Sequence, residues 1–147
     1  MFRSAYPDPV SERHFYADVP VKRALAWVID TALIAFIIML IVPFTGFLAL
    51  FFLGGLYLVV NFVYRWIGLA RHSATVGMRL VGVEFRDGQG YRLDTMTAFA
   101  HTLGYSLSVA FVFPQLISLA LMAFSRRGQS LTDHVLGTLL VNRAGLY

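Results

Sequence analysis

Residues 21–30 read VKRALAWVID, and residues 31–42, TALIAFIIMLIV, contain no charged side chain. An aspartate therefore stands inside a run that is apolar enough for the hydrocarbon of a bilayer. An unpaired carboxylate in that environment costs about 3 kcal/mol on insertion scales. Asp30 must therefore face protein or water and be either hydrogen-bonded or protonated, which constrains how the remaining chain packs around it.

The composition of the whole chain also indicates a membrane protein. Of 147 residues, 58% are hydrophobic and only 14% are charged, and the mean hydropathy is +0.68. The absence of cysteine excludes disulfides and thiol chemistry. The net charge of +4 comes from basic residues scattered singly between apolar segments. We therefore expect this charge to record membrane topology, and we expect no nucleic-acid partner.

Three segments are long and apolar enough to be membrane helices, namely 24–42, 47–68 and 98–124. The fold class that follows is an all-α membrane protein, a small transmembrane helical bundle with two spans and a third, Pro-bent segment. The domain organisation that we expect is a cytoplasmic N-terminal tail (1–20), one transmembrane domain (21–142) and a C-terminal tail (143–147).

Polar and proline residues mark the ends of the first helix. Asp18 is the expected N-cap, and Pro20 falls in the first turn, where its missing N–H costs nothing. Pro43 closes the helix at its far end and begins a tight turn, PFTG. The first segment lies too late in the chain, and is too long, for a cleaved signal peptide.

Basic residues indicate the topology, because Lys and Arg in short loops stay in the cytoplasm. They occur before the first segment, between the second and third, and after the third, but not in the turn PFTG. A single third span would put the C-terminal arginines outside. A bend at Pro114 and Gln115 would instead form a hairpin with a short second limb, 116–124, that returns them to the cytoplasm. We prefer this hairpin, and a single kinked span is the alternative.

The connector MRLVGVEFRDGQGYRLD, residues 78–94, has a pattern of its own. Side chains from Leu80 to Arg86 alternate in character as in an extended chain, and DGQG has the residues of a tight turn. We expect a short β-like strand or hairpin at the cytoplasmic surface. The apolar stretch GTLLVN, residues 137–142, is either its partner strand or a final buried turn.

Candidate partners for Asp30 lie on both long helices. Arg23 precedes it by two helical turns, about 10.5 Å, which is long for a direct bridge. On the second segment, Asn61, Tyr64 and Arg65 share one polar face, and Asn61 lies at about the depth of Asp30. We therefore expect Asn61 to be hydrogen-bonded to Asp30, while the two arginines can simply extend to the lipid headgroups.

Several short motifs occur in a characteristic order and spacing. They are Arg23 and Asp30 in the first segment, T-x-G-x-R-L-x-G-V (75–83), a D-G turn (87–88) and SLTDHVLGTLLV (130–141). Together they resemble the RDD family of small integral membrane proteins over nearly the whole chain. The family is named for one arginine and two aspartates, which by position would be Arg23, Asp30 and Asp133. The resemblance implies transport as a suggested activity, with cation/proton antiport proposed for some members.

This chain departs from the family pattern at two positions. Similar proteins usually have a lysine at Met78 and an arginine at His101. A histidine can lose its charge near neutral pH, whereas an arginine cannot. If His101 lies near Asp30, the two side chains can hold one proton between them and exchange it. The alternative is that His101 is a polar residue at the lipid interface.

Asp133 has two expected roles that can coexist. Ser130 and Asp133 have the spacing of a capping box, in which the serine caps a helix and the acid reaches back to its N-terminus. Asp133 can also pair with Arg23 at the membrane surface, because a carboxylate has two oxygens.

No catalytic motif is present, so we expect no enzyme, no metal and no other cofactor. One hypothesis is a small transporter with a candidate ion or proton site at Asp30, Asn61 and His101. The other is a non-transporting accessory or scaffold protein in which the same Arg and Asp residues set helix packing. For partners we expect the lipid bilayer and either a second copy of the chain or another membrane protein. The expected location is a bacterial inner (cell) membrane, with the N-terminus in the cytoplasm.

Overall fold

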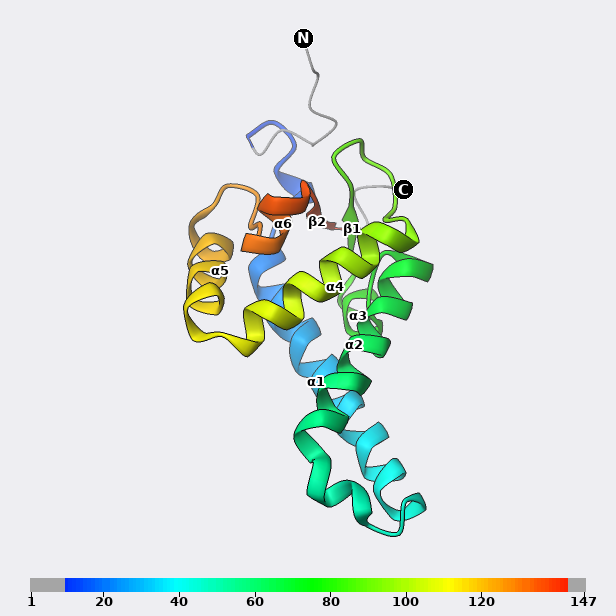
Figure 1. Cartoon of the computed structure of the whole chain (residues 1–147). Coiled ribbons are helices and arrows are strands. Elements are labelled where there is room, and N and C mark those ends of the chain that lie inside the picture. The colour runs from blue at the N-terminus through cyan, green and yellow to red at the C-terminus, as the bar shows by residue number, and fades with distance from the viewer. Residues whose placement is uncertain (1–9, 143–147) are drawn as a thin grey trace.

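The computed structural model describes residues 10–142 and contains two long helices where the hydropathy predicts them (Figure 1). A 3-10 helix, η1 (Arg13–Phe15), precedes α1 (Val19–Phe44), and a second one, η2 (Leu48–Phe52), leads into α2 (Leu53–His72). Both long helices are apolar enough to cross a bilayer. The turn that joins them projects away from the rest of the molecule (Figure 1).

The first helix begins and ends close to the predicted residues. Asp18 precedes it, Pro20 lies in its first turn and Pro43 in its last. The Asp18 side chain makes no capping hydrogen bond, because its backbone has φ 59° rather than the extended conformation from which N-cap side chains reach the first turn. The helix therefore starts at the expected place without the expected cap.

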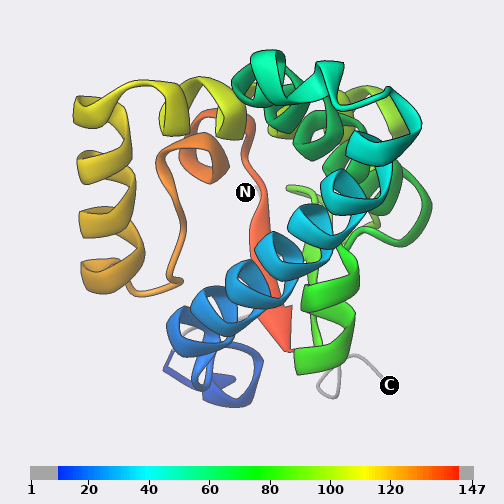
Figure 2. The same cartoon turned by 90° about the horizontal axis from the view of Figure 1, so that it is seen from below.

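The third apolar segment consists of two helices that meet at a sharp bend. The directions of α4 (Thr95–Ala110) and α5 (Val112–Phe124) differ by 114° (Figure 2). The bend lies at Phe111, and the prediction that placed it at Pro114 is wrong by three residues. A proline ring excludes the carbonyl of the residue four positions earlier, which here belongs to Ala110, the last residue of α4. Pro114 therefore falls in the first turn of α5.

The apex of this bend is apolar and its two ends are polar. Phe111, Val112 and Phe113 are between 60% and 80% exposed. Asp94 caps α4 by accepting a hydrogen bond from the backbone N–H of Thr97, at 2.7 Å. A hairpin can insert into the bilayer with its bend leading, provided that the side chains at the bend are apolar. The exposed side chains at this bend meet that condition. The arrangement favours the hairpin over one kinked span.

A small sheet joins the middle of the chain to its end. β1 (Val83–Arg86) pairs antiparallel with β2 (Leu139–Asn142), and α6 (Leu131–Leu136) lies just before β2. Residues 137–142 thus contribute the partner strand, one of the two predicted alternatives. The extended chain predicted from Leu80 is wrong at its start, because Val76–Val81 form a short helix, α3, capped by the Thr75 side chain.

The core lies where α1, α2 and α4 meet α3 and the sheet. Its buried apolar residues are Val19, Ala26, Leu69, Ala74, Met78, Val83, Phe85, Leu93, Ala98 and Leu140. Farther along the two long helices, large apolar side chains such as Phe36, Phe44 and Leu58 are exposed. An apolar surface of this extent is unfavourable in water, so these side chains pack against lipid acyl chains.

The closest approach of α1 to α3 is at Gly77. A Cβ atom there would lie 2.3 Å from the carbonyl oxygen of Ala26 and 2.7 Å from Oδ1 of Asp30. Both distances are shorter than van der Waals contact, and the first involves backbone that cannot rotate away. A glycine is therefore required at this position for the two helices to touch.

Replacing Gly77 by alanine should lower the thermal unfolding temperature in detergent, at a cost of about 1–3 kcal/mol, because the helices must move apart. The matched control is Gly54→Ala, since nothing lies within 4 Å of a Cβ at Gly54 in α2. The control should be neutral or stabilising by up to about 1 kcal/mol. Equal unfolding temperatures for the two variants would contradict the close approach.

Candidate functional site

Asp30 is buried and accepts three hydrogen bonds. The Tyr64 hydroxyl donates to Oδ1 at 2.6 Å and the Gly77 backbone N–H donates to the same oxygen at 2.8 Å. The Thr75 hydroxyl donates to Oδ2 at 2.6 Å. Because only 1% of Asp30 is exposed, these bonds replace the water that the carboxylate would otherwise need. The side chain ties α1 to α2 and to α3.

The contact with α3 explains the pattern T-x-G in the sequence. Thr75 is the N-cap of α3, and its hydroxyl both accepts from the Met78 N–H and donates to Asp30. The N–H of Gly77 lies in the first turn of α3, where it has no partner within the helix, and it donates to Asp30 instead. The absence of a side chain at Gly77 leaves room for the carboxylate. The aspartate of one helix thus sits at the N-terminus of another, where the backbone dipoles favour a negative charge.

The predicted hydrogen bond between Asn61 and Asp30 does not occur in residues 10–142. Asn61 is buried, but the residue of α2 that reaches Asp30 is Tyr64. The two share a helix face, and the tyrosine has the longer side chain. The predicted face of α2 is therefore correct, but the predicted residue on it is wrong, and the partners Thr75 and Gly77 were not predicted.

Asp133 is the second buried carboxylate, and all of its partners are donors. Arg23 Nη1 lies 2.8 Å from Oδ2, and His101 Nε2 lies 2.7 Å from Oδ1. The Thr138 hydroxyl donates to Oδ1 at 2.8 Å, and the Ser130 N–H donates to Oδ2 at 3.0 Å. A residue of α6 therefore gathers side chains from α1, α4 and the chain that enters β2.

Both predicted roles of Asp133 are present together. Ser130 and Asp133 form the capping box of α6, and Asp133 also forms the ion pair with Arg23. The expected proximity of His101 to Asp30 is not found. His101 instead binds Asp133 and stacks against Phe85, with ring centroids 4.4 Å apart. The position of His101 along its helix could not indicate whether its side chain would contact Asp30 or Asp133.

The pKa of Asp133 lies well below the ordinary value of a carboxyl group. Burial by itself raises this pKa, but the positive charge of Arg23 and the hydrogen bonds from His101 and the Ser130 N–H together outweigh the effect of burial. The group is therefore ionised in the folded protein. Its pairing contributes stability that is complete above about pH 4, the ordinary carboxyl pKa, and that is lost as the pH falls below it.

Arg65 of α2 is the third charged group in this region. Its guanidinium carbon lies 3.7 Å from the centroid of the Tyr105 ring, and the Tyr105 hydroxyl accepts a hydrogen bond from Trp27 Nε1 at 3.0 Å. The prediction that Arg65 extends to the lipid headgroups is wrong. Arg65 is in fact 5% exposed and points inward, which no local pattern could indicate.

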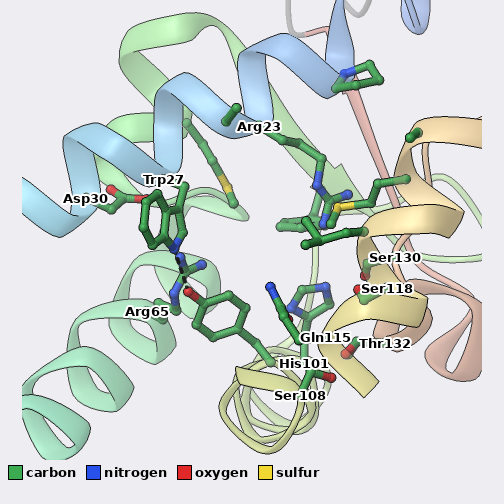
Figure 3. Close-up of a pocket in the computed structure, with 18 of the residues that line it drawn as sticks. Arg23, Trp27, Asp30, Arg65, His101, Ser108, Gln115, Ser118, Ser130 and Thr132 are labelled. Carbon is green, nitrogen blue, oxygen red and sulfur yellow. Dashed lines mark hydrogen bonds between the residues drawn. The ribbon is translucent and has the colours of Figure 1, made fainter. Parts of the chain in front are cut away.

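A cavity of about 640 Å³ connects these groups between α1, α4 and α5. Figure 3 shows Asp30, Trp27 and Arg65 toward one end of it and Gln115 and Ser118 toward the other. The polar residues that give the cavity its chemistry are Arg23, Asp30, Arg65, His101, Gln115 and Ser118. Two of the three residues predicted to form an ion or proton site, Asp30 and His101, line the cavity, but they lie at separate places in it.

Replacing Asp30 by asparagine should reduce the free energy of unfolding by about 1–3 kcal/mol, because an amide has one acceptor oxygen for the three donors around it. The measurement is thermal denaturation in detergent. Asp18→Asn is the matched control, since Asp18 is exposed in the same chain region and its side chain makes no cap hydrogen bond. If both variants unfold like the wild type, Asp30 does not hold these helices together.

The unfolding temperature of the wild type should fall more steeply below pH 4 than that of Asp133→Asn. A carboxyl with a lowered folded-state pKa loses stability as it is protonated, by up to about 1.4 kcal/mol per pH unit. The variant should be less stable at pH 7 and give a flatter curve between pH 5 and pH 3. Parallel curves for the two proteins would show that Asp133 does not govern acid unfolding.

The sequence was also compared with known proteins. A model of the RDD family matches residues 18–137, from the residue before α1 to the residue after α6. Neither a curated protein nor a solved structure matches the sequence. The match covers most of the chain, including Arg23, Asp30 and Asp133, and it agrees with the apolar helices of the structure. This chain is a membrane protein that belongs to the RDD family.

Proposed function

We propose that this protein is a small transporter whose ligand occupies the cavity between α1, α4 and α5. The observation that carries the proposal is the cavity itself, which opens among the apolar helices and is lined by the charged or ionisable groups of Arg23, Asp30, Arg65 and His101. Such groups are expensive inside a membrane protein and commonly mark the path of an ion or a polar substrate. A purely structural bundle would fill this space with apolar side chains.

The proton-responsive element of the transporter is the contact of His101 with Asp133. Arg23 binds one oxygen of this carboxylate and His101 binds the other. The groups that face His101 are therefore Asp133, Arg23 beyond it and the Phe85 ring. When His101 gains a proton, its positive charge at Oδ1 weakens the attraction of Asp133 for Arg23, which is bound at Oδ2. Arg23, which lines the cavity, is then released toward a ligand.

Asp30 serves the fold in this proposal. Its two oxygens accept three hydrogen bonds from neutral donors of the protein, so the carboxylate is already solvated. This observation also supports the second candidate function, a non-transporting accessory protein in which the Arg and Asp residues only set helix packing. The two functions differ in what they predict for His101, whose conversion to a fixed cation should affect only a transporter.

We place the protein in a bacterial inner membrane with its N-terminus in the cytoplasm. The basic residues at the start of α1 and those that follow α5 support this orientation, because cytoplasmic loops carry an excess of Lys and Arg. The bend at Phe111 lets both ends of the α4 and α5 pair lie on that side. The exposed apolar surface leaves room for a second copy of the chain or another membrane protein as partner.

The test is ligand-driven proton movement into liposomes that contain the purified protein and a trapped pH dye. Gradients of sodium, potassium, inorganic phosphate and hexyl phosphate are imposed one at a time. Wild type should move protons in response to at least one of them. His101→Arg should keep the ion pair with Asp133 but lower the proton flux by about tenfold or more, because an arginine does not release its proton.

His72→Arg is the matched control, since His72 is exposed at the end of α2, and it should behave like the wild type. Unfolding temperatures are measured for both variants to show that they are folded. Wild-type vesicles that respond to none of the four gradients would overturn the proposed transport. A His101→Arg variant with full proton flux would overturn the role of the histidine.

A further inference from the structure

Arg65 is a buried cation without a hydrogen-bonded counterion in the described part of the chain. Arg65 lies two turns, about 10 Å, before the end of α2. It is therefore too far from the carbonyl groups at the C-terminus of the helix to be stabilised by them. The ion pairs within residues 10–142 are Arg23 with Asp133, His101 with Asp133 and Arg86 with Glu84. A buried charge that has no partner is strongly destabilising, so Arg65 calls for an acceptor.

The contact with Tyr105 satisfies only part of this requirement. The ring lies against the face of the guanidinium, at 3.7 Å, where a cation–π interaction stabilises the charge. The N–H groups of a guanidinium lie in its plane and still need acceptors. Arg65 Nε is buried and has no hydrogen-bond partner. The edge of the guanidinium is therefore free at the wall of the cavity.

The two buried carboxylates nearby are already committed. Asp30 contributes its negative charge to the region, but its oxygens accept from Tyr64, Thr75 and Gly77. Asp133 accepts four hydrogen bonds of its own. Neither accepts a hydrogen bond from Arg65 in the described part of the chain, so the edge of the guanidinium is left for an acceptor from outside the chain.

The opposite wall offers another donor. Ser118 of α5 accepts a hydrogen bond from the Leu131 N–H, at 3.3 Å, which leaves its own O–H free to donate. Ser118 is buried, and Gln115 lies one turn earlier on the same helix and also lines the cavity. The guanidinium at one end of the cavity suits an oxyanion, and the hydroxyl and amide groups toward the other end can donate to further polar atoms of a ligand (Figure 3).

Apolar side chains form most of the remaining surface of the cavity and reach the surface of the molecule. Val28 of α1 and Leu119 of α5 line the cavity and are 57% and 49% exposed. Met78 and Met122 add flexible apolar walls. A ligand here can therefore place a hydrocarbon chain along Val28 and Leu119 toward the bilayer, while its charged end stays inside.

We infer that this cavity binds an amphiphilic anion, a phosphate or carboxylate that carries an alkyl or acyl chain, with its oxyanion at Arg65. The inference rests on the proposed function in assigning a ligand to the same cavity, and it concerns binding rather than movement. The oxyanion supplies the in-plane acceptors that Arg65 lacks, and it replaces the water that would otherwise occupy the cavity. The chain of the ligand buries apolar surface against α1 and α5.

The test is calorimetric binding of hexyl phosphate to the purified protein in a neutral detergent. Wild type should bind hexyl phosphate, and should bind hexyltrimethylammonium, which has the same chain and the opposite charge, about tenfold more weakly or not at all. Arg65→Gln should weaken hexyl phosphate binding about tenfold or more. The matched control is Arg71→Gln, which removes a charge from an exposed position on the same helix and should bind like the wild type.

Equal binding of the two hexyl compounds by the wild type would overturn the inference without depending on any variant. A folded Arg65→Gln protein with wild-type affinity would also overturn it. To identify the source of the anion, the titration is repeated in bilayer discs with and without phosphatidylglycerol. Competition by this lipid identifies a lipid headgroup as occupant, and unchanged affinity identifies a soluble anion. Binding without proton flux would refute the proposed transport and leave this inference standing.

Discussion

The fold depends on one buried carboxylate, because Asp30 holds three helices through three hydrogen bonds. In the apolar interior of a membrane protein an unsatisfied carboxylate is strongly unfavourable, so the packing around it is limited to arrangements that supply donors. Tyr64 and Thr75 supply hydroxyls and Gly77 supplies a backbone N–H. The absence of a side chain at Gly77 is part of the same constraint, since α3 must come close enough for its N–H to reach the carboxylate.

Asp133 performs a similar task nearer the end of the chain. It caps its own helix and binds Arg23 of α1 and His101 of α4. The capping box is local and forms within one turn, whereas the ion pair joins residues far apart in sequence. Asp133 also helps to position β2 beside β1, because Thr138, the residue before that strand, donates a hydrogen bond to it. The two carboxylates thus support the helices on either side of the cavity.

The cavity follows from the bend between α4 and α5. A continuous helix over this segment would run along one line, whereas the turn at Phe111 directs α5 away from the line of α4 (Figure 2). The cavity lies between α5 and α1. Arg65 extends into that space because Tyr105 of α4 covers one face of its guanidinium. With both carboxylates occupied by other donors, the cavity is better suited to an anion than to the cation that Asp30 alone would favour.

Local chemistry in the sequence determined the class of protein, the apolar segments, the presence but not the place of a break in the third segment, the capping box and the pair of Arg23 with Asp133. These features depend on hydropathy, proline geometry, helix-capping residues and the strong preference of a basic residue for an acid near the membrane. Tertiary structure alone decided that Tyr64 rather than Asn61 binds Asp30, that His101 meets Asp133, and that Arg65 turns inward. Helical periodicity gives the face and depth of a side chain, but its partner depends on how the helices rotate and approach, which is set by all of their contacts together.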